Sequence, residues 1–174
     1  MVRTLKPEDM ALLAYDGPVR MKFGNWKFRK RVAAFDYDHT LVQALGGKRW
    51  SDGVDDWEWT AECVPEVIRG FWKRGWCIVV FTNQEREYKL TQIRNVIESL
   101  GVPVYVFAAM SPADKKPSLT MWKGLMEGRG RQVAEGSFYC GDQGGRPGDR
   151  HNRDRLFAER AGIKWVSPES VFRV

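Results

Sequence analysis

From about residue 31 onward, short apolar runs alternate with segments in which apolar residues recur at helical spacing. The helical patterns cover about 64–74, 90–100, 118–126 and 154–161. The apolar runs have the composition of buried strands and lie at 32–35, 77–81, 102–107, 137–140 and 163–166. This alternation predicts an α/β fold, in which a parallel, Rossmann-like sheet carries helices on both faces. Because ligands bind beyond the carboxyl ends of the strands in such sheets, functional residues are expected there.

The first thirty residues do not follow this alternation. We expect residues 1–30 to form an N-terminal extension, and residues 31–174 to form the main domain. Apolar and polar residues alternate over 21–28, which predicts a strand added to the sheet.

The stretch from Leu41 to Glu62 is also long for a connection within a compact domain. Loops of this length are usually functional or disordered. Its three tryptophans, which argue against disorder, are Trp50, Trp57 and Trp59. They could stack on unpaired bases or simply pack the loop onto the domain.

The composition, at 174 residues with 43% hydrophobic and 29% charged, is that of one ordinary globular domain. The first ten residues lack the apolar core of a signal peptide, and no apolar run is long enough to cross a bilayer. Three widely spaced cysteines predict neither a disulfide framework nor a zinc site. We therefore expect an intracellular monomer, cytoplasmic or nuclear, without a membrane partner. A net charge of +6 fits a polyanionic partner, but also a solvated basic face.

Candidate chemistry begins with two carboxylates in the turn after the first predicted strand. Asp36 and Asp38 stand two residues apart, in the sequence Asp-Tyr-Asp-His-Thr that ends at Thr40. Such a pair can address one bound group from two sides, so that one carboxylate attacks it and the other transfers protons. Taken alone, the same pattern also fits a solvated turn or part of a calcium-binding loop.

Three further polar clusters follow the next three predicted strands. Thr82 and Asn83 can donate hydrogen bonds to phosphate oxygens, and Lys116 can neutralise a phosphoryl group. Asp142 could complete a Mg²⁺ site with Asp36. Each cluster alone also fits a helix cap or a turn. Their recurrence at four strand ends, in order, favours an active site.

These residues resemble the four motifs of the haloacid dehalogenase superfamily of phosphotransferases. The motifs are Asp36-x-Asp38-x-Thr40, Thr82, Lys116 and Gly141-Asp142. Longer segments, VAAFDYDHTLV, IVVFTNQ, YCGDQGGR and DRLFAERAGIKWVSPESVF, resemble the 3′-phosphatase domain of polynucleotide kinase/3′-phosphatase. The resemblance runs from about Arg31 to the C-terminus. It implies a haloacid dehalogenase-like fold, here without a large cap domain, and a 3′-phosphatase that processes DNA ends in repair.

The resemblance also implies a role for each matching residue. Asp36 would be the nucleophile that forms an aspartyl-phosphate. Asp38 would protonate the departing O3′, and its backbone carbonyl would bind Mg²⁺ together with Asp36 and Asp142. Thr82 and Lys116 would complete the catalytic set. The residues that the resemblance assigns to substrate binding are Thr40, Asn83 and Arg146, and those that it places around the metal rather than on it are Asp149 and Asp154.

The chain departs from the family pattern at His39, where the family usually has glycine, and after Gln84, where a glycine-containing loop is shortened. No G-x-x-x-x-G-K-[ST] segment occurs in the sequence, so we expect no kinase domain. Two alternative functions remain open at this point. One is a small-molecule phosphomonoesterase of the same superfamily, and the other is a non-catalytic module that binds nucleic-acid ends.

Overall fold

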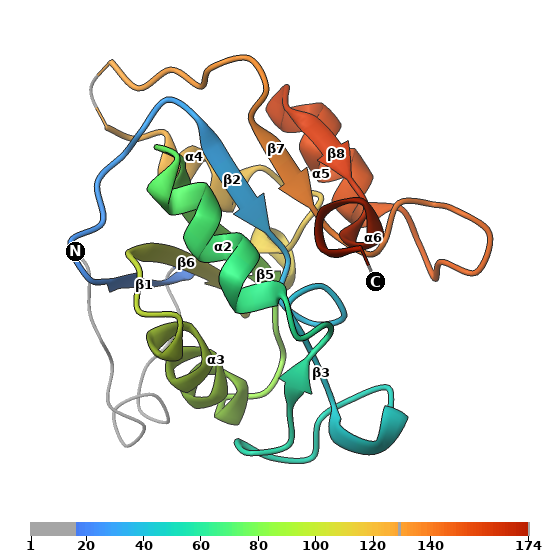
Figure 1. Ribbon diagram of the computed structural model, residues 1–174. Helices are drawn as coiled ribbons and strands as arrows, with labels where there is room; N and C mark the ends of the chain where they lie inside the picture. Colours follow the sequence, from blue (N-terminus) through green and yellow to red (C-terminus); the bar gives the residue numbers. More distant parts are fainter. Residues whose placement is uncertain (1–16, 129, 174) are drawn as a thin grey trace.

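The structure is a computed structural model that describes residues 17–128 and 130–173 of the 174-residue chain. A six-stranded sheet with strand order β1-β6-β5-β2-β7-β8 forms its centre (Figure 1). All neighbouring strands are parallel except the β1–β6 pair, which is antiparallel. The strands are β1 (Val19–Phe23), β2 (Val32–Phe35), β5 (Cys77–Asn83), β6 (Val104–Ala109), β7 (Phe138–Cys140) and β8 (Lys164–Val166).

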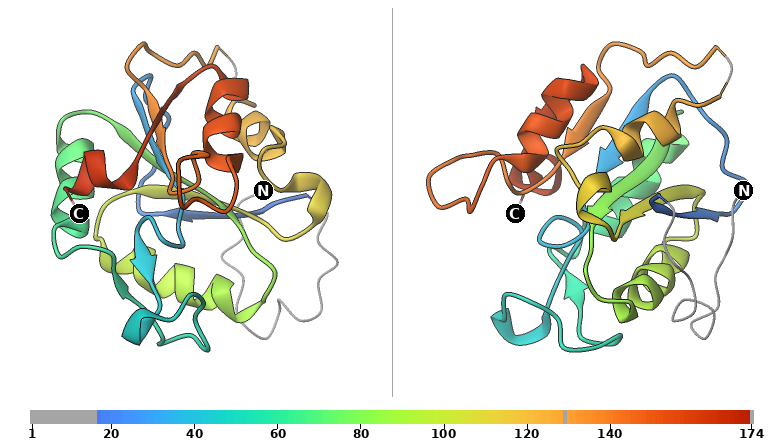
Figure 2. Two further views of the ribbon diagram at one scale, coloured as in Figure 1. Left: turned by 90° about the vertical axis from the view of Figure 1, so that its right-hand side faces the viewer. Right: turned by 180° about the vertical axis from the view of Figure 1, so that it is seen from behind.

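Helices cover both faces of the sheet, which confirms the predicted α/β fold. On one face, α2 (Val64–Lys73) and α3 (Tyr88–Ser99) pack against the sheet, joined by the short C-terminal α6 (Pro168–Phe172). The other face is covered by α4 (Thr120–Leu125) and α5 (Arg153–Ala161), as the rear view in Figure 2 shows for α4. Strand β2 shows why both layers form, because Ala33 and Phe35 enter one core and Val32 and Ala34 enter the other. No helix within the described residues is long and apolar enough to cross a membrane.

The central strand β2 lies at the point where the order of connections reverses. The chain runs from β2 to β5 and β6 on one side, and returns to β7 and β8 on the other side. The carboxyl end of β2 is therefore flanked by the ends of β5 and β7. In open α/β sheets, ligands bind at this topological switch point. Asp36 follows β2 directly, and its N–H donates a 2.8 Å hydrogen bond to the carbonyl of Cys140, the last residue of β7.

The long loop after β2 is ordered by a small ribbon of its own. Strands β3 (Val42–Gln43) and β4 (Glu58–Trp59) pair antiparallel, and a 3-10 turn, η1 (Leu45–Gly47), lies between them. The rings of Trp57 and Trp59 contact each other edge to face at 5.1 Å and pack against the core. Two of the three loop tryptophans are thus structural. A second 3-10 turn, η2 (Pro112–Asp114), precedes Lys115 and Lys116.

The added N-terminal strand differs from the prediction. The alternating stretch 21–28 does not form one strand, because pairing with β6 ends at Phe23. Gly24 then adopts a φ of 61°, and the chain turns so that Trp26 donates from its indole nitrogen to the carbonyl of Ile78 at 3.0 Å. Residues 1–16 of the predicted extension lie outside the described residues.

Candidate active site

A cleft of about 360 Å³ opens at the carboxyl ends of the parallel strands. This volume lies at the lower end of the range of small-ligand sites, about 300–1,000 Å³. Residues from all four predicted clusters line it, including Asp36, Asp38, Thr82, Lys116 and Asp142. The convergence follows from the topology, because parallel strands deliver their ends to one edge of the sheet.

Asp36 lies on the floor of the cleft beside a buried ammonium group. Lys116 Nζ lies 3.0 Å from Asp36 Oδ1, 2.7 Å from Asp154 Oδ1 and 2.6 Å from the hydroxyl of Tyr139. Asn83 holds the backbone of Lys116, since its Oδ1 accepts from the Lys116 N–H at 2.8 Å and its Nδ2 donates to the Lys116 carbonyl at 3.2 Å. This clamp fixes one cation between two carboxylates.

The electrostatics of the floor follow from burial and from the crowding of carboxylates. Burial raises the pKa of Asp36 well above its ordinary value; the charge of Lys116 opposes this shift, and the charges of Asp154 and Asp142 add to it. Burial alone would lower the pKa of Lys116, but the charges of Asp154 and Asp36 more than offset it and raise the pKa. These shifts favour the charged form of the Lys116 ammonium. A further cation beside Asp36 would stabilise its ionised carboxylate.

Asp38 faces a different set of partners from those of Asp36. Its Oδ1 lies 2.6 Å from Nζ of Lys89, and its Oδ2 accepts a 2.8 Å hydrogen bond from Nε2 of Gln84. Lys89 comes from the first turn of α3, and only 8% of its side chain is exposed. Gln92, one turn later, accepts from Lys89 Nζ at 3.0 Å. The second carboxylate of the pair is thus held in one orientation by a cation and an amide.

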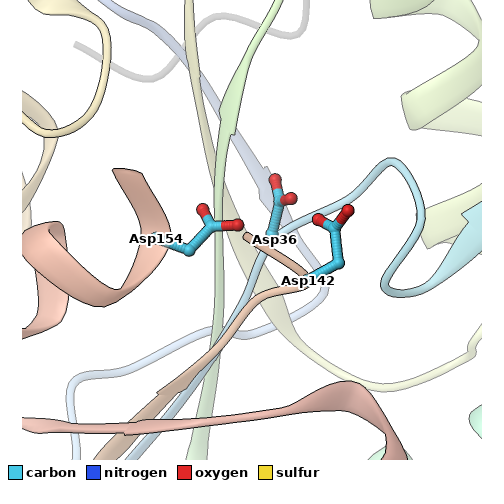
Figure 3. Close-up of side chains that lie close together, drawn as sticks. All are labelled: Asp36, Asp142 and Asp154. Atoms are coloured by element: carbon cyan, nitrogen blue, oxygen red, sulfur yellow. The ribbon is translucent and has the colours of Figure 1, made fainter. Parts of the chain in front are cut away.

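Three carboxylates converge where a metal ion could bind. Asp36, Asp142 and Asp154 each offer an oxygen, and these oxygens all lie within 4.8 Å of one another. Figure 3 shows the three side chains directed towards a common point, from the ends of β2 and β7 and from the start of α5. Asp142 Oδ2 accepts from Gln143 Nε2 at 2.7 Å. Hard carboxylate oxygens with room for water and phosphate are what Mg²⁺ prefers, so the donor set fits this ion.

The family model described as polynucleotide kinase 3 phosphatase matches residues 31–172 of the chain. The chain belongs to this family. The matched residues include all those that line the cleft and every strand of the six-stranded sheet except β1.

Relatives of known name support this membership. A bifunctional polynucleotide phosphatase/kinase of Schizosaccharomyces pombe is 32% identical over 163 residues, which cover 87% of this chain and 40% of that protein. The polynucleotide 3′-phosphatase ZDP of Arabidopsis thaliana is 27% identical over 169 residues, covering 82% of this chain and 24% of that one. This chain therefore spans less than half the length of either relative.

A solved structure supports the fold. The D,D-heptose 1,7-bisphosphate phosphatase of B. bronchiseptica, complexed with magnesium and phosphate, superimposes with a TM-score of 0.60 over 78% of this chain and 79% of that one. At 18% sequence identity, this likeness concerns the fold alone.

Two residues that the polynucleotide kinase 3 phosphatase resemblance assigned to substrate binding do not line the cleft. Thr40 is fully buried, and its Oγ1 has no hydrogen-bond partner among the described residues. Arg146 is turned away, because its guanidinium contacts Asp149, Glu169 and the carbonyl of Asp142. Arg146 therefore organises the loop after β7. The cleft instead receives Arg150 from the same loop.

Asp149 and Asp154, which the resemblance placed around the metal, occupy different positions in the structure. Asp149 does not line the cleft; its Oδ2 accepts from the N–H groups of Gly144 at 2.9 Å and Arg146 at 3.0 Å, which shapes the loop. Asp154 lines the cleft and contacts Lys116, so it belongs to the floor itself.

Sequence reasoning missed Lys89 and Gln84, the partners of Asp38. A signal for Lys89 was present, since it stands four residues before Ile93 on the buried stripe of α3. A lysine at an apolar position of a helix marks a buried partner of opposite charge. His39 is also informative, because its φ of 60° lies in the left-handed region. That conformation favours glycine, the residue that the resemblance led us to expect at this position.

Proposed function

We propose that this protein is a Mg²⁺-dependent polynucleotide 3′-phosphatase that removes a 3′-phosphate from a DNA end. The observation that carries the proposal is the position of Asp36, at the topological switch point and in contact with a buried, charged Lys116. Family membership and the names of the two relatives supply the substrate class.

The first half of the reaction uses both aspartates. Lys116 holds Oδ1 of Asp36, so we assign the attack on phosphorus to Oδ2. The new bond from Oδ2 to phosphorus forms an aspartyl-phosphate as the bond from phosphorus to O3′ breaks. Asp38 gives a proton to O3′, so the DNA strand leaves with a free hydroxyl group.

The second half returns the enzyme to its starting state. Asp38, now a carboxylate, takes a proton from a water molecule that attacks phosphorus. The bond from phosphorus to Oδ2 breaks, inorganic phosphate forms, and Asp36 is a carboxylate again. In the structure, Gln84 and Lys89 hold Asp38 in one orientation through contacts of 2.8 and 2.6 Å, which supports a fixed position for this group at the reacting phosphate.

Asp36 and Asp142, together with the backbone carbonyl of Asp38, would hold Mg²⁺. When bound, the ion supplies positive charge to the phosphoryl oxygens and to the buried Asp36 carboxylate. Thr82 and Asn83 line the same cleft and can donate to phosphate oxygens, and Lys116 adds a fixed positive charge.

The test is phosphate release from two otherwise identical oligodeoxynucleotides, one 3′-phosphorylated and one 5′-phosphorylated, with Mg²⁺ or with EDTA. Histidinol phosphate serves as a small phosphomonoester. We expect release from the 3′ end alone and only with Mg²⁺. The Asp36→Asn variant keeps the shape of the side chain but is a poor nucleophile, so it should fold and release nothing.

Turnover of histidinol phosphate with both oligonucleotides untouched would assign the site to small phosphomonoesters. Full activity of a folded Asp36→Asn variant would refute the nucleophile. Binding of DNA ends without any phosphate release by the wild-type protein would favour the non-catalytic module.

A further inference from the structure

One large aromatic side chain at the cleft remains unused by the chemistry above. Trp50 lines the same cleft as Asp36, yet 49% of its surface is exposed to solvent. Tryptophan is highly buried on average, and an exposed indole in the lining of a cleft offers a contact surface for a ligand. Trp57 and Trp59, from the same loop, are packed against the core instead.

The Trp50 indole is set among polar and cationic partners. The His39 ring contacts it edge to face, with centroids 5.3 Å apart and planes at 65°. The guanidinium of Arg150 lies 4.9 Å from the indole centroid, and that of Arg49 lies 5.8 Å from it. An aromatic ring beside guanidinium groups is a surface on which nucleobases stack, with positive charge nearby for the phosphodiester backbone.

The backbone that carries Trp50 is firmly anchored. The carbonyl of Ser51 accepts from the Tyr88 hydroxyl at 2.5 Å, and the Ser51 hydroxyl accepts from Gln92 Nε2 at 3.1 Å. Gln92 is fully buried and also contacts Lys89, which holds Asp38. The exposed ring is therefore connected by short contacts to the α3 residues that orient the second aspartate.

Arg150 is anchored within the loop after β7. Its N–H donates to Gln143 Oε1 at 2.7 Å, while Gln143 Nε2 donates to Asp142 Oδ2 at 2.7 Å. Both members of the Trp50–Arg150 pair thus come from segments fixed to the catalytic floor. A ring held in place before the ligand arrives loses little conformational freedom on binding.

We propose that Trp50, with Arg150 and His39, binds the base of the terminal nucleotide while its 3′-phosphate lies against Asp36. The proposal rests on the 3′-phosphatase function proposed above. It assigns the terminal base, rather than the phosphodiester backbone alone, as a determinant of substrate choice. The ligand class is a 3′-nucleotide, and any of the four bases is accepted because each has a stacking face.

The experiment compares two 3′-phosphorylated oligodeoxynucleotides that differ only at the last nucleotide. One ends in thymidine and the other in a stable abasic tetrahydrofuran residue. kcat/KM is measured for both with the wild-type protein and with Trp50→Ala and Trp50→Phe. Leu45→Ala is the matched control, because Leu45 is 45% exposed in the same loop region and does not line the cleft.

We expect the wild-type protein to prefer the base-bearing end by roughly 5- to 150-fold, as one stacked base provides. Trp50→Ala should bring this preference close to one, Trp50→Phe should keep part of it, and Leu45→Ala should keep all of it. Because the ring is half exposed, all variants should melt near the wild-type temperature.

Equal turnover of the two ends by the wild-type protein would overturn the proposal. So would a Trp50→Ala variant that keeps the wild-type preference, or one that slows on both substrates by the same factor, since the ring would then shape the cleft instead of binding the base. If histidinol phosphate is hydrolysed and neither oligonucleotide is, the proposed function itself fails, and the base site with it.

Discussion

Replacing Lys116 by methionine removes the ammonium group that contacts both Asp36 and Asp154 on the floor of the cleft. Methionine has nearly the same length and fills most of the volume, so the main change is the loss of charge. Only 4% of the Lys116 side chain is exposed, and 3% of that of Asp154. Water therefore cannot easily replace the lost partner.

The expected cost is that of an uncompensated charge in the interior. Removing one partner of a buried ion pair destabilises a protein by about 3–5 kcal/mol. For a chain of this size each kcal/mol lowers the melting temperature by about 2–4 °C, so the variant should melt roughly 6–20 °C below the wild type. Activity should be lost as well, since the fixed cation beside the nucleophile is gone.

The loss should depend on pH in a defined direction. Burial already raises the pKa of Asp36, and removing Lys116 abolishes the charge that opposes this shift. A carboxyl group whose folded pKa exceeds its unfolded value of about 4 favours the fold at low pH, and this contribution disappears as the pH rises. The melting deficit of Lys116→Met should therefore be smallest near pH 5 and larger at pH 8.

Thermal unfolding followed by circular dichroism, at both pH values and in EDTA, measures this deficit without compensation by a divalent cation. Lys115→Met is the matched control. Lys115 contacts Glu85 at 3.2 Å, and 84% of the Glu85 side chain is exposed, so its loss should cost at most about 1 kcal/mol. A Lys116→Met variant that melts with the wild type at pH 8, or a deficit that shrinks with rising pH, would refute the reasoning.

Three other substitutions probe different parts of the site. Lys89→Met frees Asp38 from its 2.6 Å contact, so kcat on a 3′-phosphorylated oligonucleotide should fall by up to about 100-fold with little change in KM, in steady-state assays. Gly141→Ala places a Cβ 2.5 Å from Asp154 Cγ, so the melting temperature should fall and half-maximal activity should need more Mg²⁺. The Asp56 pKa is lowered to about 2, chiefly by the hydrogen bond from Lys48. Asp56→Asn should therefore destabilise the protein at pH 7, and this difference should diminish below pH 4 in thermal melts.

For each of these three substitutions, one result would contradict the prediction. An unchanged kcat for Lys89→Met would show that Gln84 alone orients Asp38. Wild-type stability of Gly141→Ala would mean that Asp154 can move without cost. A melting difference for Asp56→Asn that stays constant between pH 7 and pH 3 would remove charge from the explanation.

The sheet and the central residues of the site could be predicted because the signals are local. A buried apolar run followed at once by polar residues marks a strand end, and parallel strands deliver such ends to one place. Asp36, Thr82 and Asp142 follow this rule, and so they meet in the cleft as expected. Lys116 follows no strand directly, but its place in the order of the four motifs along the sequence predicted that it would lie in the same cleft.

What the sequence left open depends on how side chains turn after the backbone is placed. Arg146 and Arg150 stand four residues apart in one loop, yet only Arg150 reaches the cleft, since Asp149 and Glu169 hold Arg146 elsewhere. The three loop tryptophans look alike in the sequence. Only the ribbon of β3 and β4 decides that Trp59 packs inward while Trp50 stays exposed.

Strand β1 has a consequence for how the protein can be shortened. The family model begins at residue 31, so a chain trimmed to it would lose β1 and uncover β6. That strand, VYVFAA, is entirely buried and carries neither charge nor proline, the composition of segments that assemble into amyloid-like stacks. Among the described residues, β1 is the outermost strand on this side of the sheet, and its alternating Arg20 and Lys22 discourage other chains from adding to it. Strand β1 thus covers a sheet edge that would otherwise favour association between chains, so we expect a chain trimmed to residue 31 to aggregate more readily.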